Sequence, residues 1–179
     1  MSIILNGTTG ITTPDITSTT STLGSLTQAL DLGSTGQIVF PATQNASANA
    51  NTLDDYEEGT WTPAVTFGGN AVGATYTTQI GRYVKVGNAV TVFCVLALSS
   101  KGSSSGSAVI TGLPFTALEG SAATLTAYDV GNSGYIWGQQ GVGTTLVLYT
   151  VSTAGTRTNI TNTNFSNDTN INFSVTYIV

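Results

Sequence analysis

Apolar and polar residues alternate most regularly at the end of the chain. Apolar side chains occupy every second position there, and polar residues fill most of the positions between them. A period of two residues places the two sets on opposite sides of a β-strand, so this run predicts a strand with one buried face. Because the last residue still fits the pattern, we expect the strand to continue to the end of the sequence. The expected buried set is Ile171, Phe173, Val175, Tyr177 and Val179.

A second regular run, Ala89–Leu98, is apolar on both of its faces, because Phe93 and Val95 lie opposite the main apolar set. Such a strand lies centrally in a sandwich or packs against a neighbouring subunit, and both alternatives stay open here. Ile80–Val86 precedes it, and Gly87-Asn88 between the two runs predicts a two-residue hairpin because both residues tolerate positive φ. The main apolar face comprises Val90, Val92, Cys94, Leu96 and Leu98.

Four shorter strand-like runs, separated by turns, complete the second half of the chain. Gly131-Asn132-Ser133-Gly134 predicts a further hairpin, and Asn159–Asp168 predicts a polar loop or a weak strand. Strands at this spacing, without a strong helical pattern, indicate an all-β fold. We expect an antiparallel β-sandwich of jelly-roll-like form over residues 64–179. The four runs are Ala108–Thr111, Ala123–Val130, Tyr135–Gln139 and Thr145–Val151.

Residues 1–50 are a polar tract with sparse apolar positions. Such a segment buries too little apolar surface to fold alone, so we expect an arm that is either disordered or an extended arm or stalk that partners keep ordered. Within it, Leu23–Leu32 predicts a short helix and Gln37–Phe40 predicts a short strand. Residues 51–63 are expected to form an acidic collar or linker, with Trp61 as the first anchor of the core. The collar residues are Asp54, Asp55, Tyr56, Glu57, Glu58 and Trp61.

Charge and cysteine content narrow the possible classes of protein. The chain has four Lys and Arg against nine Asp and Glu, for a formal net charge of −5. Four basic residues are too few for the patch that nucleic acid requires, which disfavours such a partner. No apolar run reaches the roughly 18 residues of a membrane helix, and Met1–Asn6 lacks the basic flank of a signal peptide. We expect no membrane insertion, and we expect the single cysteine, Cys94, to be a small buried hydrophobe.

Candidate catalytic chemistry is sparse. The sequence has no histidine, which removes Ser-His-Asp and Cys-His arrangements and the commonest metal ligand. It also lacks a phosphate-binding GxxxxGK[ST] motif. The acidic cluster Asp54–Glu58 offers carboxylates that could hydrolyse a glycan or hold a hard cation. The favoured interpretation is a solvated acidic connector that pairs with Arg82 or Lys85, with no cofactor and no metal.

Aromatic side chains are the other candidates, because an exposed ring combines a large apolar surface with a polar edge. Such rings can stack on sugars while nearby Asn and Thr side chains bond the hydroxyls. For each ring taken singly, packing in the core or on the sheet is the competing interpretation. We expect the tip of the Tyr128–Trp137 hairpin to be an exposed patch, with Asn132 and the Asn159–Asp168 loop as second choice. The candidate receptor-binding residues are Tyr128, Asn132, Tyr135, Trp137, Asn162 and Asn164.

Three motifs together resemble a known type of module. They are NTLDDYEEGTWTPAVTFGG at residues 51–69, YTTQIGRYVKVGNAVTV at residues 76–92, and ITGLPF at residues 110–115. This set is similar to the C-terminal module of bacteriophage tail-fibre and receptor-binding proteins. The resemblance covers roughly Gln37 to Phe115, and its most specific parts are Leu53–Pro63 and Gly81–Gly87.

The resemblance implies a non-enzymatic homotrimer on the exterior of a phage particle. Its N-terminal arm would attach to tail, baseplate or capsid proteins, and its β head would bind a glycan or protein of the host surface. The arm is short for a long tail fibre, so a capsid decoration, cement or head-fibre protein with a structural role is an alternative. A glycan hydrolase using the cluster Asp54–Glu58 is a weaker alternative. The expected attachment residues are Ile3, Ile4, Leu5, Ile11 and Ile16.

Overall fold

The computed structural model describes residues 36–131 and 134–179. The chain divides into two compact units, Met1–Ile38 and Val39–Val179, and we call the second unit the head. Asn132 and the expected helix Leu23–Leu32 lie outside the described residues. So do the five expected attachment residues, Ile3, Ile4, Leu5, Ile11 and Ile16.

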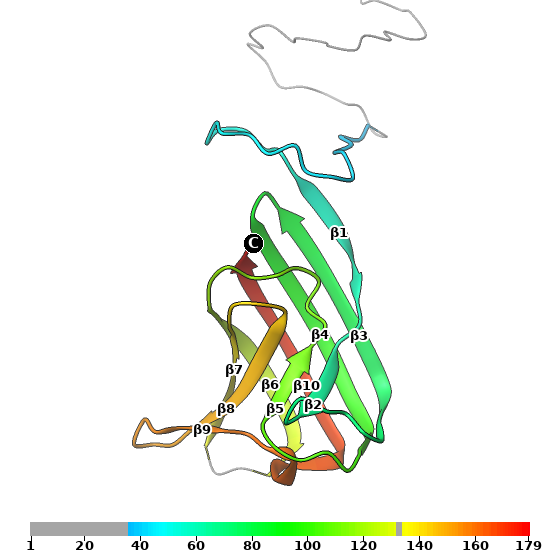
Figure 1. Cartoon of the computed structure of the whole chain (residues 1–179), viewed down its shortest axis with the longest axis vertical. Helices are drawn as coiled ribbons and strands as arrows, with labels where there is room; N and C mark the ends of the chain where they lie inside the picture. The colour runs from blue at the N-terminus through cyan, green and yellow to red at the C-terminus, as the bar shows by residue number, and fades with distance from the viewer. Residues whose placement is uncertain (1–35, 132–133) are drawn as a thin grey trace, which may run out of the picture. The chain divides into compact units, whose positions relative to one another are not determined.

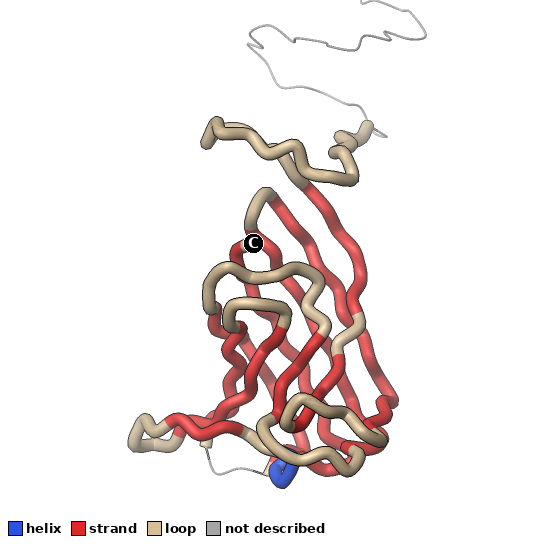
Figure 2. The backbone as a smooth tube through the Cα atoms, viewed as in Figure 1, coloured by secondary structure: helices blue, strands red, loops and turns tan. Residues whose placement is uncertain are grey.

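The head is built of β-strands, and every strand pairing in it is antiparallel. This confirms the all-β prediction. The only helical segment of the described residues is the 3-10 turn η1 (Asn162–Asn164), shown in blue in Figure 2. No helix within residues 36–131 and 134–179 is long and apolar enough to cross a membrane. The strands are β1 (Tyr56–Trp61), β2 (Ala64–Phe67), β3 (Ala74–Val86), β4 (Ala89–Lys101), β5 (Ala108–Thr111), β6 (Ser121–Val130), β7 (Tyr135–Gln140), β8 (Thr145–Val151), β9 (Arg157–Asn159) and β10 (Phe165–Ile178).

The strands form one curled sheet with the order β1-β3-β4-β10-β6-β7-β8-β5-β2, and β9 pairs with β8. We call β1, β3, β4, β10 and β6 sheet A, and β6, β7, β8, β5, β2 and β9 sheet B. Strand β6 belongs to both, since Ser121–Ala123 pairs with β7 while Thr124–Val130 pairs with β10. Figure 1 shows how the two halves of the curl face each other. The arrangement is consistent with a β-sandwich-like fold.

Strands β3 and β4, of 13 residues each, form a hairpin in sheet A. Its turn is at Gly87-Asn88, as the sequence predicts. Val86 pairs with Ala89 across a two-residue turn, and Gly87 adopts φ of +55°. A residue with a side chain is disfavoured in that left-handed region, so Gly87 fixes both the turn and the register behind it.

The core lies between the two sheets and is lined by the alternating residues of the central strands. The apolar set of β4, Val90 to Leu98, is at most 4% exposed, and on β10 the residues Ile171 to Tyr177 are at most 5% exposed. Both predicted buried faces are therefore confirmed except at Val179, which is partly buried and lies beyond the last residue of β10, Ile178. The opposite face of β4 is different, because Phe93 is 51% exposed and Val95 is 40% exposed. Within the single chain, that second apolar face of β4 is left open.

Cys94 gives a direct test of this core. Its side chain is 2% exposed, and burial raises the pKa of its thiol to about 12. Because the thiolate is the reactive form, we expect negligible alkylation by iodoacetamide at pH 8 in native buffer and complete alkylation in denaturant, as measured by mass spectrometry. Similar rates in the two conditions would contradict the placement of β4.

Several local predictions are wrong. Gln37–Phe40 forms no strand. About half of the expected linker, residues 51–63, is the edge strand β1. All six residues of β1 pair with residues of β3. By contrast, the Asn159–Asp168 segment agrees in part with the expected polar loop or weak strand, because it contains the end of β9, the turn η1 and the start of β10. The expected β6–β7 hairpin pairs only at its far end, because Thr124–Val130 turns away to join β10.

Candidate functional site

Two neighbouring strands of sheet B place their aromatic side chains side by side on the outer face. Tyr135 and Trp137 are two residues apart on β7, so both point to the same side. The register sets Trp137 directly opposite Tyr149 of β8, and their ring centroids lie 5.6 Å apart with an interplanar angle of 34°. Cross-strand aromatic pairs of this kind stabilise a sheet and hold each ring in one orientation.

Arg157 completes this group from the short edge strand β9. It pairs with Val151 of β8, and its side chain extends over the sheet until Cζ lies 4.3 Å from the centroid of the Tyr149 ring. One guanidinium nitrogen, Nη1, donates a hydrogen bond of 2.8 Å to Oε1 of Gln139 on β7. The stacked ring and the amide hold the guanidinium in place, and most of its five N–H donors remain available.

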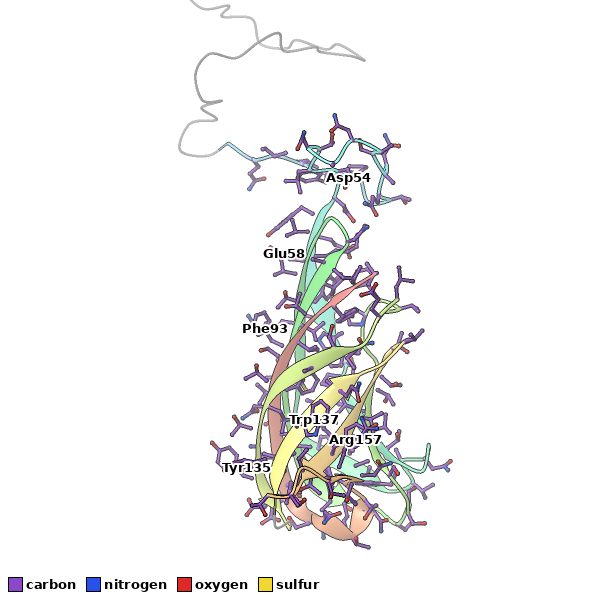
Figure 3. All side chains as sticks on the ribbon, turned by 90° about the vertical axis from the view of Figure 1, so that its left-hand side faces the viewer. Asp54, Glu58, Phe93, Tyr135, Trp137 and Arg157 are labelled. Atoms are coloured by element: carbon purple, nitrogen blue, oxygen red, sulfur yellow. The ribbon has the colours of Figure 1, made fainter. Side chains whose placement is uncertain are left out.

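We call this set the aromatic platform; it comprises Tyr135, Trp137, Gln139, Tyr149 and Arg157. Tyr135 is 80% exposed, Arg157 is exposed, and the other members are partly buried. Figure 3 shows Tyr135, Trp137 and Arg157 near one end of the head, with Asp54 at the other end. The platform combines flat apolar surface with oriented hydrogen-bond donors. This combination is suited to binding a ligand that has a flat face and polar edges.

The remaining described candidates, Tyr128 of the hairpin and Asn162 and Asn164 of the Asn159–Asp168 loop, do not join this surface. Tyr128 is 57% exposed, but it pairs with Asn170 of β10 and so belongs to the outer face of sheet A. Asn162 Oδ1 accepts a 2.9 Å hydrogen bond from the Gly106 amide, and Asn164 caps η1 through its side chain. Both asparagine side chains thus hold loops together inside the chain.

The acidic residues of the collar separate along β1 because successive side chains point to opposite faces of a strand. Asp55 forms a buried ion pair with Lys85, in which each side chain is 7% exposed. Glu57 accepts a hydrogen bond from Tyr83, and this bond, with a smaller effect of burial, raises the pKa of Tyr83 to about 12. Of the two predicted basic partners, Lys85 is therefore confirmed, whereas Arg82 forms no ion pair within the described residues.

The two other acids of the collar make local contacts. Glu58 accepts a 2.9 Å hydrogen bond from the Tyr56 hydroxyl. Asp54 accepts a 2.7 Å bond from the backbone amide of Ser47 and a 3.2 Å bond from Gln44. The amide of Ser47 is the main reason that the pKa of Asp54 is lowered. Across residues 36–131 and 134–179, no three His, Cys, Asp or Glu side chains gather as metal ligands would.

The sequence predicts aromatic members of the platform as binding residues but does not predict its polar members. Tyr135 and Trp137 were expected as candidates, whereas Gln139 and Arg157 were not. The signal for Gln139 was its position, because it continues the alternation of Tyr135 and Trp137 along β7. Arg157 lies on a three-residue strand with no hydrophobic pattern, so nothing in the sequence indicated that it would reach Tyr149.

No family model, no curated protein and no solved structure matches the chain in comparisons with known proteins. The functional interpretation therefore rests on the geometry of the head and on the motifs of the sequence.

Proposed function

We propose that this chain is a non-enzymatic fibre protein of a phage particle. In this proposal its jelly-roll-like head forms homotrimers and binds a glycan on the host surface, and residues 1–50 attach it to other virion proteins. The observation that carries the proposal is the aromatic platform on sheet B. A sugar ring would stack on Trp137 and Tyr135, and the guanidinium of Arg157 would donate hydrogen bonds to its hydroxyl or carboxylate oxygens.

The layout of the head supports this division of roles. The platform lies near the end of the head remote from Asp54, as Figure 3 shows. The segment that precedes β1 lies at the Asp54 end of the head, so the platform is remote from the start of the sheet. A binding role also agrees with the collar, where Asp55, Glu57 and Glu58 each have a partner of their own. A glycosidase instead needs two carboxyl groups that flank one bond.

We expect Trp137→Ala to weaken glycan binding by the full-length chain at least about tenfold, a loss of about 1.4 kcal/mol or more. Arg157→Gln should weaken binding by a similar factor because it removes most of the oriented donors. Binding is measured on an array of bacterial surface polysaccharides and confirmed by adsorption to intact cells. The matched control is Val142→Ala, which removes an exposed apolar side chain outside the platform and should leave binding unchanged.

The same measurements separate the proposal from a decoration role. A wild-type chain that binds no polysaccharide and no cells, but does bind empty capsids, would contradict adhesion and favour a structural protein of the capsid. Wild-type binding that survives both Trp137→Ala and Arg157→Gln would move the receptor site away from the platform. Each variant is first checked for an unchanged melting temperature, since Trp137 also packs on Tyr149.

A further inference from the structure

The outer face of sheet A carries an unusual share of exposed apolar side chains. Fourteen large hydrophobic residues are exposed among those that the structure describes, and seven of them lie on this one face. Strand pairing brings them into register, with Ile80 opposite Val95 and Tyr56 opposite Val86. The seven are Tyr56, Ile80, Val86, Phe93, Val95, Tyr128 and Ile178.

This face is large enough to serve as a stable interface between protein chains. It spans the five neighbouring strands β1, β3, β4, β10 and β6, which at about 4.8 Å spacing give a width of about 24 Å. Strands β4 and β10 pair from Asn170–Ala97 to Ile178–Ala89, a length of about 30 Å. The product is about 700 Å² per chain, which a trimer would divide between two neighbours. This total is comparable to the roughly 800 Å² that each partner buries in a standard interface.

Two opposite charges identify what kind of partner fits. Glu58, Arg82 and Phe93 line a shallow hollow of about 470 Å³ on this face, and Glu58 and Phe93 appear on the same side of the head in Figure 3. No ion pair or hydrogen bond of the Arg82 guanidinium occurs within the described residues. Among the residues that the structure describes, Glu58 accepts one side-chain hydrogen bond, from the Tyr56 hydroxyl. The hollow thus offers one free cation and one nearby anion, so two copies of it are complementary in charge.

The paired stretches of β10 and β6, Asn170–Ile178 and Thr124–Tyr128, add no charge to this face. Apart from Ile178 and Tyr128, their outward residues are short polar side chains, and Thr176 shares a hydrogen bond of 2.8 Å with Thr91 opposite it on β4. Each chain carries a net charge of −5, but the paired part of this face balances Glu58 with Arg82, and the exposed Asp129 and Asp168 lie beyond it. Two such faces can therefore approach with less repulsion than the net charge of the chains would cause.

We propose that the outer face of sheet A is the contact between copies of this chain, with Arg82 of one copy pairing with Glu58 of its neighbour around the Phe93 ring. The inference rests on the homotrimer of the proposed function and names the surface that forms it. It also accounts for the two-sided apolar strand β4, whose inner face fills the core while its outer face is covered by the neighbouring copy. The aromatic platform lies on sheet B and stays accessible in such an assembly.

The first test measures the mass of the full-length chain by analytical ultracentrifugation. Wild type should sediment as a trimer at micromolar concentration, and Phe93→Lys should raise the dissociation constant at least about tenfold, because a charge would enter the apolar contact. The matched control is Val142→Lys, which alters an apolar residue that is 76% exposed elsewhere on the head and should leave the mass unchanged. Equal melting temperatures of the dissociated variant and dissociated wild type confirm that Phe93→Lys folds.

The second test exchanges the charges. Glu58→Arg and Arg82→Glu should each weaken the assembly, and the double variant should restore it, because the pair is re-formed between copies in the opposite sense. A trimer that persists through Phe93→Lys, Glu58→Arg and Arg82→Glu would overturn this face as the contact. A wild-type monomer would overturn it as well. Glycan binding by the platform is measured in parallel on the same samples, so a failure of the contact is distinguished from a failure of the proposed adhesion.

Discussion

Replacing Trp61 with alanine is expected to lower the free energy of unfolding by about 3–5 kcal/mol, as measured by chemical denaturation. The side chain is 8% exposed and packs against Phe173 of the central strand β10, with ring centroids 6.3 Å apart. Its indole Nε1–H donates a 3.2 Å hydrogen bond to the carbonyl of Arg82. Trp61 is the last residue of β1, where the chain leaves sheet A for sheet B. The substitution therefore removes both a large core ring and the contact that closes the curl.

Two further variants accompany Trp61→Ala: one removes an exposed aromatic ring as a control, and the other disturbs the packing around Trp61. Tyr135→Ala removes an aromatic ring that is 80% exposed, so its effect on stability should stay within about 0.5 kcal/mol. Gly81 pairs with Trp61, and an added Cβ would lie 2.7 Å from the indole ring and 2.5 Å from the Trp61 carbonyl. Gly81→Ala should therefore also destabilise the head, by forcing the ring to move. A loss below about 1 kcal/mol for Trp61→Ala would show that β1 is not anchored in the core.

The second large effect concerns the buried ion pair between Asp55 and Lys85. Lys85→Met should lower the free energy of unfolding by about 3–5 kcal/mol, because it leaves the Asp55 carboxylate buried without its cation. Both side chains are 7% exposed, and the Lys85 ammonium also lies 5.8 Å from the centroid of the Phe115 ring. The pair joins the residue before β1 to β3, so its loss should release the start of the edge strand.

The matched control is the double variant Asp55→Leu with Lys85→Met. Replacing both members of a buried pair with apolar residues of similar volume is often neutral, so the double variant should be markedly more stable than Lys85→Met alone. Thermal melts of wild type, both single variants and the double variant form a complete double-mutant cycle. If Lys85→Met lowered the free energy of unfolding by less than about 1 kcal/mol, water would be screening the ion pair as it screens pairs on a protein surface.

The strands with a buried face were the predictable part of this fold. β4 and β10 are central and carry apolar residues at every second position, and Gly87 marks the turn before β4. Strand β1 lacked such a signal, because most of its side chains are exposed and it holds only one deeply buried residue, Trp61. An edge strand is stabilised by pairing with its neighbour, and pairing leaves little trace in the sequence.

The division of β6 between two sheets was equally hidden. Its residues alternate between small apolar and polar types, which predicts a strand but not the partner. The Asn132 turn suggested β7 as the partner along the whole length. In the structure most of β6 pairs with β10, where Ala127 and Leu125 lie opposite the core residues Ile171 and Phe173. The pairing of strands distant in sequence depends on packing across the whole core.

Only part of the candidate site could be predicted, because the rest depends on which strands pair. Exposed aromatic residues beside a turn were a visible signal, and they led to Tyr135 and Trp137. The strand register then added Tyr149 and Gln139, and a three-residue edge strand added Arg157. Asn162 and Asn164 were selected for their residue type, but the chain uses their amides to hold a 3-10 turn and its neighbouring loops.

The pairing of β1 with β3 also determines how the head would respond to mechanical load. The two strands share six residue pairs, from Tyr56–Val86 to Trp61–Gly81, and their hydrogen bonds lie perpendicular to the strand axis. Tension on the chain before Tyr56, directed along β1, would load all of these bonds together in shear. They would not open one after another as in a zipper. The ion pair of Asp55 and the ring of Trp61 lie at the two ends of this segment, so the strand that receives the tension is secured at both ends.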